Sequence, residues 1–171
     1  MEENFDFADE FKGQACLRMG ECLEKIRVCL ELLDEGSFWY RPNPSSNSAG
    51  HLLRHLSGNI RQYILSGLRG DTDVRQRDKE FIYPPDHSRA EVESDFFETA
   101  ETAMKVIRAL SDEALWRQKT VQGFQLTGLG IILHVVEHLS YHTGQIAYLT
   151  KLKTDSDLGF YRGIDLNTTN D

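Results

Sequence analysis

The chain has 171 residues, of which 40% are hydrophobic and 27% charged, and 19 basic against 27 acidic side chains give a formal net charge of −8. This length suits one domain, residues 1–171, that forms its core without disulfides. The negative charge argues against nucleic acid binding, and no segment approaches the ~18 uninterrupted apolar residues that span a bilayer. The acidic start MEENFDFADE lacks the basic and apolar regions of a signal peptide. We therefore expect a cytoplasmic protein that binds neither nucleic acid nor membrane.

The first predicted helix covers residues 8–33, where apolar side chains recur at steps of three and four. It contains all three cysteines, Cys16, Cys22 and Cys29. Their spacing along a straight helix, roughly 9 to 10 Å, is too long for a disulfide, so we expect buried free thiols. Gly36 and the segment RPNP at 41–44 end the helix and favour an extended connection.

Three further long helices follow. Serine-rich N-caps and apolar periodicity predict a second helix over 48–68, and a polar segment at 69–86 reads as a solvated loop. The pair Ser88 and Glu91 forms a capping box for a third helix that reaches about 110. A short polar stretch at 117–125, around Gly123, is expected to be extended or a turn, and it precedes a final helix over about 127–152. Four long helices without alternating strand patterns predict an all-α four-helix bundle.

Histidine spacing is the strongest functional signal. Five of the six histidines stand four residues apart, as His51 with His55 and as His134, His138 and His142 in series. This spacing places neighbouring imidazoles on one helix face. Neutral imidazole binds zinc, nickel, copper or iron, and two ligands from one helix with a third from another leave positions open for water or substrate.

The spacing leaves several alternatives open. It does not choose between His51 and His55, and it allows His134 to be a fourth ligand, an orienting neighbour or a cap on the site. The segment HVVEH at 134–138 also matches the H-x-x-E-H pattern of inverzincin proteases, in which Glu137 would be a general base. That reading leaves His142 without a role, so we favour the three-histidine site.

Three segments together resemble the DinB-like, YfiT-related metalloprotein superfamily. They are NSAGHLLRHLSGNIRQYILSG at 47–67, HVVEHLSYHTGQIAYLTKL at 134–152 and DLGFY at 157–161. The resemblance covers most of the chain and implies an up-up-down-down four-helix bundle that often forms a homodimer. It also implies a divalent transition-metal ion, such as Zn, Ni, Fe or Mn, held by His55, His138 and His142.

The residues beside these ligands are candidates for orienting them. A carboxylate or amide that accepts a hydrogen bond from the second ring N–H fixes the tautomer of a metal-bound histidine. Glu137, Gln145, Asn59 and Arg61 lie next to the ligands in the sequence. By the resemblance, His51 precedes the first ligand by one helical turn.

Two functions remain open at this point. The superfamily includes thiol S-transferases that use low-molecular-weight thiols, which implies a metal-dependent transferase or small-molecule hydrolase acting on a small-molecule substrate. The alternative is a non-catalytic metal-binding or interaction protein, in which the ion ties two helices together. A fold-level analogy alone does not decide between them.

Overall fold

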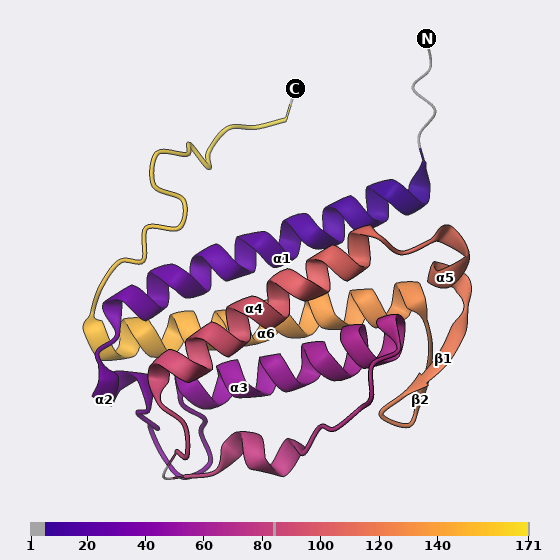
Figure 1. The fold of residues 1–171 in the computed structure, drawn as a ribbon. Helices are drawn as coiled ribbons and strands as arrows, with labels where there is room; N and C mark the ends of the chain where they lie inside the picture. The colour runs from indigo at the N-terminus through magenta and orange to yellow at the C-terminus, as the bar shows by residue number, and fades with distance from the viewer. Residues whose placement is uncertain (1–5, 84, 171) are drawn as a thin grey trace.

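The computed structural model describes residues 6–83 and 85–170, and most of them are helical (Figure 1). The long helices are α1 (Phe7–Leu32), α3 (Ala49–Ile60), α4 (Arg89–Arg108) and α6 (Gly128–Thr154). Helix α3 continues directly into a π-helical segment, η1 (Arg61–Arg69). The shorter elements are α2 (Glu35–Phe38), the 3-10 helix η2 (Arg77–Phe81), α5 (Asp112–Trp116) and the strands β1 (Gln118–Val121) and β2 (Phe124–Thr127).

Local sequence signals set where the long helices begin. Asp6, Ser48, Ser88 and Thr127 each accept a hydrogen bond at the N-terminus of a long helix, which satisfies amides that have no partner within the helix. At α4 the predicted capping box is complete, because the Glu91 carboxylate also accepts a hydrogen bond from the Ser88 N–H. These caps confirm the predicted helix starts to within one or two residues.

The four long helices form a closed ring in which α1 packs on α6 and α4, and α3 packs on α4 and α6. Helices α1 and α6 run in the same direction, because Cys22 and Cys29 lie beside Thr143 and Thr150 in the same order. All three cysteines are buried free thiols, as expected. Helices α3 and α4 both run in the opposite direction to that pair (Figure 1).

The order of helix directions along the chain is therefore up, down, down, up, and not the up-up-down-down order that the resemblance implied. The connection at 33–48 reverses the chain after α1, so the next long helix is antiparallel to α1. The longer connection, described at 70–83 and 85–88, returns along the outside of the bundle before α4 begins, which makes α3 and α4 parallel (Figure 1).

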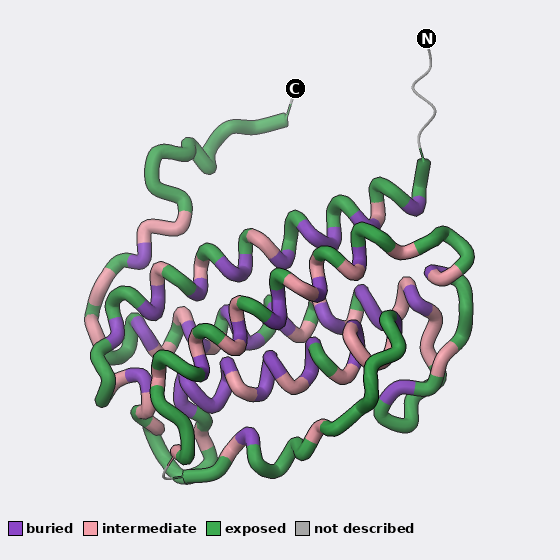
Figure 2. The backbone as a smooth tube through the Cα atoms, in the orientation of Figure 1, coloured by how far each residue is buried: buried purple, intermediate pink, exposed green. Residues whose placement is uncertain are grey.

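The core lies along the bundle axis, where the buried faces of the four helices meet (Figure 2). Its largest fully buried side chains include Phe38, Tyr63, Phe96, Met19 and Ile26. Within the described ranges, no helix combines the length and the apolar character needed to cross a bilayer.

The polar stretch after α5 forms a two-stranded antiparallel hairpin, with Val121 opposite Phe124. Gln122 and Gly123 form its turn and both have positive φ angles. This hairpin packs beside η1 and at the start of α6. The stretch predicted to be extended or a turn therefore contains both strands and a turn.

Candidate metal centre

Helices α3 and α6 bring His55, His138 and His142 together. One ring nitrogen from each lies within 4.8 Å of the others, and the Nε2 atoms of His55 and His138 are 2.9 Å apart. In the described part of the chain, this is the one cluster of three histidine, cysteine or acidic side chains with metal-ligand spacing. The antiparallel packing of α3 on α6 thus juxtaposes residues 83 positions apart.

A buried carboxylate orients His55. The Nδ1 atom of His55 lies 2.8 Å from Oε2 of Glu80, and both side chains are less than one-tenth exposed. An ionised carboxylate can only accept, so Nδ1 donates its proton to Glu80, and the lone pair of Nε2 faces the other histidines. This is the arrangement by which a carboxylate fixes a metal-ligating imidazole.

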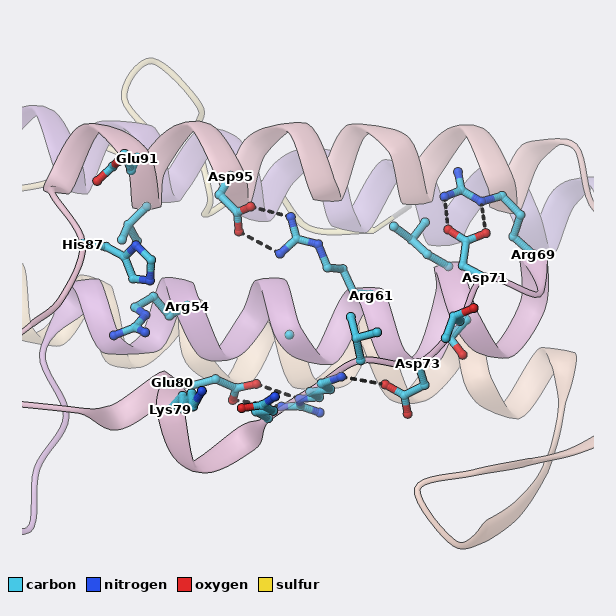
Figure 3. A pocket seen from close by; sticks show the side chains of 18 residues that line it. Arg54, Arg61, Arg69, Asp71, Asp73, Lys79, Glu80, His87, Glu91 and Asp95 are labelled. Carbon is cyan, nitrogen blue, oxygen red and sulfur yellow. Dashed lines mark hydrogen bonds and ion pairs between the residues drawn. The ribbon is translucent and has the colours of Figure 1, made fainter.

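Arg75 holds that carboxylate in place. Its Nε donates to Oε1 of Glu80 at 2.7 Å, and its Nη2 donates to Oε2 at 3.0 Å (Figure 3). Burial acts to raise the pKa of Glu80, but hydrogen bonds from His55 and Arg75 outweigh it and lower that pKa. Arg75 also donates from Nη1 to Gln62 at 2.9 Å, so the segment before η2 is attached to η1.

Gln145 orients the second histidine. Its side-chain carbonyl accepts a hydrogen bond from Nδ1 of His142 at 2.7 Å, one turn along α6. The proton on Nδ1 leaves the Nε2 lone pair of His142 free. The lone pairs of His55 and His142 therefore converge beside His138, and a donor set of this kind fits a divalent transition-metal ion.

Electrostatics keep His138 and His142 in their neutral, ligand-competent form. Burial and the neighbouring imidazoles of His142 and His55 lower the pKa of His138 to about 3. Burial also lowers the pKa of His142, although its hydrogen bond to Gln145 acts in the opposite direction. Near neutral pH both imidazoles are therefore neutral, and each keeps one nitrogen lone pair, as metal binding requires.

His134 lies one turn before His138 and belongs to a neighbouring polar cluster. Its ring stacks on Tyr63 of η1 with centroids 4.2 Å apart, and its Nε2 lies 3.3 Å from Nδ2 of Asn59. The rings of His134 and His138 are also stacked, at 5.5 Å. The structure thus places His134 and Asn59 beside His138, but not among the three histidines whose ring nitrogens converge.

His51 and Glu137 lie away from the cluster of three. The ring of His51 is 2.7 Å from the Ser48 hydroxyl and 2.9 Å from the carbonyl oxygen of Ile82, so it ties the loop at 82 to the start of α3. Glu137 is exposed on the outer face of α6. The geometry of an inverzincin site, with Glu137 acting between His134 and His138, is absent from the described residues.

Sequence reasoning missed Arg75 and Glu80. Charges of both signs alternate through 69–79, which predicted a solvated loop, yet the side chains of Arg75 and Glu80 are only 5% and 9% exposed. Of the other sequence candidates, Arg61 pairs with Asp95 across to α4 and does not reach the histidines. The apolar run Phe81-Ile82-Tyr83 directly after Glu80 was the available signal that this segment returns to the bundle.

Solved structures share this fold. A DinB-like protein from Bacillus subtilis, YjoA, matches with a TM-score of 0.65 and 15% identity, covering 84% of this chain and 94% of its own. A DinB-like protein from Bacillus cereus ATCC 10987 matches with a TM-score of 0.61 and 18% identity, covering 78% and 86% respectively. At these identities the likeness shows the fold alone.

Comparison of sequences identifies the family. No curated protein matches the chain. The family model described as "Protein of unknown function (DUF1572)" matches residues 6–161, which is nearly the whole chain. The chain therefore belongs to the DUF1572 family, and it has the fold of the DinB-like proteins.

Proposed function

We propose that this protein binds one divalent transition-metal ion through His55, His138 and His142 and uses it to activate a small nucleophile. The observation that carries the proposal is the convergence of the three imidazoles with two of their outer nitrogens already bonded, to Glu80 and Gln145. Preformed orientation of this kind is typical of metal ligands.

The proposed site has three protein ligands, as in catalytic rather than structural zinc sites. His134, which could have closed the coordination sphere, is engaged instead with Asn59 and Tyr63. A divalent ion held there would lower the pKa of a thiol or a water molecule that binds to it. A thiol S-transferase or a small-molecule hydrolase is therefore the reaction class that we favour, with a low-molecular-weight thiol as cosubstrate in the first case.

The protein's own residues would position and protect the reacting groups. Phe81 lies against His55 and Tyr141 against His142, with ring centroids 5.1 and 5.0 Å apart, so aromatic rings flank the cluster of three on two sides. Phe81 is half-buried and Tyr141 is 63% exposed, which leaves an approach beside α6.

The first test is the metal content of gently purified protein beside the His142→Ala variant. We expect close to one equivalent of zinc, nickel, iron or manganese in the native protein and a loss of that metal in the variant. Glu137→Ala, on the exposed face of the same helix, is the matched control and should keep the metal. A native protein that takes up no metal even after reconstitution would contradict the proposal.

The second test separates an enzyme from a non-catalytic metal protein. Metal-loaded protein is assayed with thiols and small electrophiles, and with hydrolysable esters and amides, beside His142→Ala. Turnover that depends on both the metal and His142 supports the enzyme. A tightly held metal with no turnover across the panel would favour an ion whose role is to join α3 to α6.

A further inference from the structure

A groove separate from the three histidines runs between α3–η1 and α4, and the segment at 71–80 lines its third side (Figure 3). We call it the α3–α4 groove, and the lining side chains that matter here are Arg54, Arg61, Val74, Lys79, Glu80 and Asp95. Its volume of about 730 Å³ falls within the range of small-molecule sites.

The α3–α4 groove does not open onto the metal centre. Glu80 lines it, but His55, His138 and His142 do not. The Glu80 carboxylate and the Arg75 guanidinium separate the groove from the metal centre. Both line the groove, and Glu80 also contacts His55. A molecule in the groove would therefore lie behind His55 and would not touch the ion.

Most charges in the groove neutralise one another. Arg61 donates to Asp95 through Nη1 and Nη2, and Arg69 donates to Asp71 through Nε and Nη2 (Figure 3). The Arg75–Glu80 pair is the buried member of the set. The charges that take part in no ion pair decide which ligand the groove can hold.

Among the described lining residues, the charges that take part in no ion pair are of both signs. Asp73, which accepts a hydrogen bond from Gln62, and Lys79 lie at opposite ends of the view (Figure 3). Lys79 is exposed and takes part in none of the ion pairs among the described residues, and it lies at the same end of the view as Arg54 and His87 (Figure 3). Glu91, also at this end, is held by the N-terminus of α4 through Ser88. Arg54 already binds one carboxylate, with its Nη1 2.9 Å from Oδ1 of Asp86.

The rest of the groove offers apolar surface. Leu65, Val74 and Val92 line it together with the aliphatic stems of the arginines. The Arg61–Asp95 pair that bridges the groove is almost half exposed on both sides. Exposed ion pairs contribute little to stability, so a ligand can displace this one at small cost.

We propose that the α3–α4 groove binds a small organic carboxylate, with its carboxylate between Arg54 and Lys79 and its apolar body toward Leu65 and Val74. Arginine and lysine are the side chains that bind carboxylates through charge-assisted hydrogen bonds. The site is distinct from the metal centre, so this proposal does not depend on the proposed metal chemistry.

The test is calorimetric titration of the full chain with phenylacetate, and with phenylacetamide as the neutral analogue of the same shape. We expect saturable binding of phenylacetate with a dissociation constant on the order of 1 mM or tighter, and no binding of the amide. Lys79→Gln and Arg54→Gln should each weaken phenylacetate binding by about tenfold. Lys151→Gln, at the far end of α6, should leave it unchanged.

The metal centre is a competing site for a carboxylate, and the His142→Ala variant distinguishes the two. Binding that persists in His142→Ala and weakens in Lys79→Gln supports the groove even if the protein holds no metal. Binding that is lost in His142→Ala but unaffected by Lys79→Gln would overturn the proposal, as would equal binding of the amide or the absence of saturable binding. Lys79 is exposed, so folding of its variant is not in question.

Discussion

At the scale of single residues, the candidate metal centre depends on side chains that contact the histidines from outside. Glu80 and Gln145 fix the tautomers of His55 and His142, and Arg75 keeps Glu80 ionised and in place. Partners of this kind usually change metal affinity by 10- to 100-fold when they are removed. Their replacement therefore tests the geometry more sharply than removal of a ligand.

We expect Glu80→Gln to weaken metal affinity by about 10- to 100-fold, because an amide is a poorer acceptor for the His55 N–H than a carboxylate. Competition with a chromophoric chelator measures the change. Glu137→Gln removes the same charge from the exposed face of α6 and should leave the affinity unaltered. Equal affinities of the two variants would show that Glu80 does not support His55.

Gly58 is needed for Glu80 and Arg75 to approach α3. A β-carbon at this position would overlap the Glu80 carboxylate and lie 3.0 Å from Nε of Arg75. We expect Gly58→Ala to push Glu80 away from His55 and to lower metal affinity by about tenfold. Gly13→Ala, in α1 with nothing within 4 Å, should retain the affinity and stabilise the protein by roughly 0.5–1 kcal/mol in urea unfolding. Unchanged metal affinity in Gly58→Ala would contradict this role.

At the scale of elements, the site exists because α3 and α6 pack antiparallel while η2 closes one side. Each helix supplies its histidines at four-residue spacing, and η2 supplies the carboxylate. Helix α3 continues into the π-helical η1, which stacks Tyr63 on His134. Segments of π-helix often occur at functional sites. Protonation of His138 should loosen this helix packing.

The pH dependence of stability follows from His138. Its pKa is about 3 in the folded chain, against an ordinary value of 6.5, so the unfolded chain binds the proton first as pH falls. The stability that this group contributes is complete above about pH 6.5 and is lost as pH falls toward 3. For metal-free protein we expect about 2 kcal/mol to be lost between pH 7 and pH 5 from this residue.

Urea unfolding at pH 7 and pH 5 in the presence of a chelator measures this loss. His138→Gln should reduce the difference between the two pH values, because the titrating group is gone. His87→Gln, which replaces an exposed histidine, should leave the difference as in the native chain. An identical pH dependence in native protein and His138→Gln would rule out His138 as its source.

At the scale of the whole molecule, the chain is a DinB-like helical bundle with a core that spans all four long helices. The proposed ion would join α3 to α6 across that core, so it should stabilise the folded state. The homodimer that the resemblance implied stays a prediction, and sedimentation equilibrium tests it directly.

We expect removal of the metal to lower the unfolding temperature. An ion present at 100 times its dissociation constant contributes about 2.7 kcal/mol, which corresponds to roughly 5–10 °C for a chain of this size. Differential scanning calorimetry with and without a chelator measures the shift, and His142→Ala should show none. If the chelator leaves the unfolding temperature of native, metal-loaded protein unchanged, a structural contribution of the ion is contradicted.

The sequence by itself determined the helical class, the helix starts and the histidine pair of α6. Apolar periodicity and capping residues act locally, so they can be read without knowing the fold. The four-residue spacing of His138 and His142 is likewise local, because one helix holds both. The choice of His55 over His51 came from the resemblance, and the structure places the two residues accordingly, with His51 bonded to Ser48 and Ile82.

Only the tertiary structure decided the rest. Glu80 is 25 residues from His55 and lies in a segment whose alternating charges indicate a solvated loop. Its burial depends on the ion pair with Arg75 and on the space that Gly58 leaves beside α3. The same holds for the α3–α4 groove and for the order of helix directions, since both depend on how the segment at 70–83 returns along the bundle. Contacts between distant segments follow from packing of the whole chain, and no local pattern encodes them.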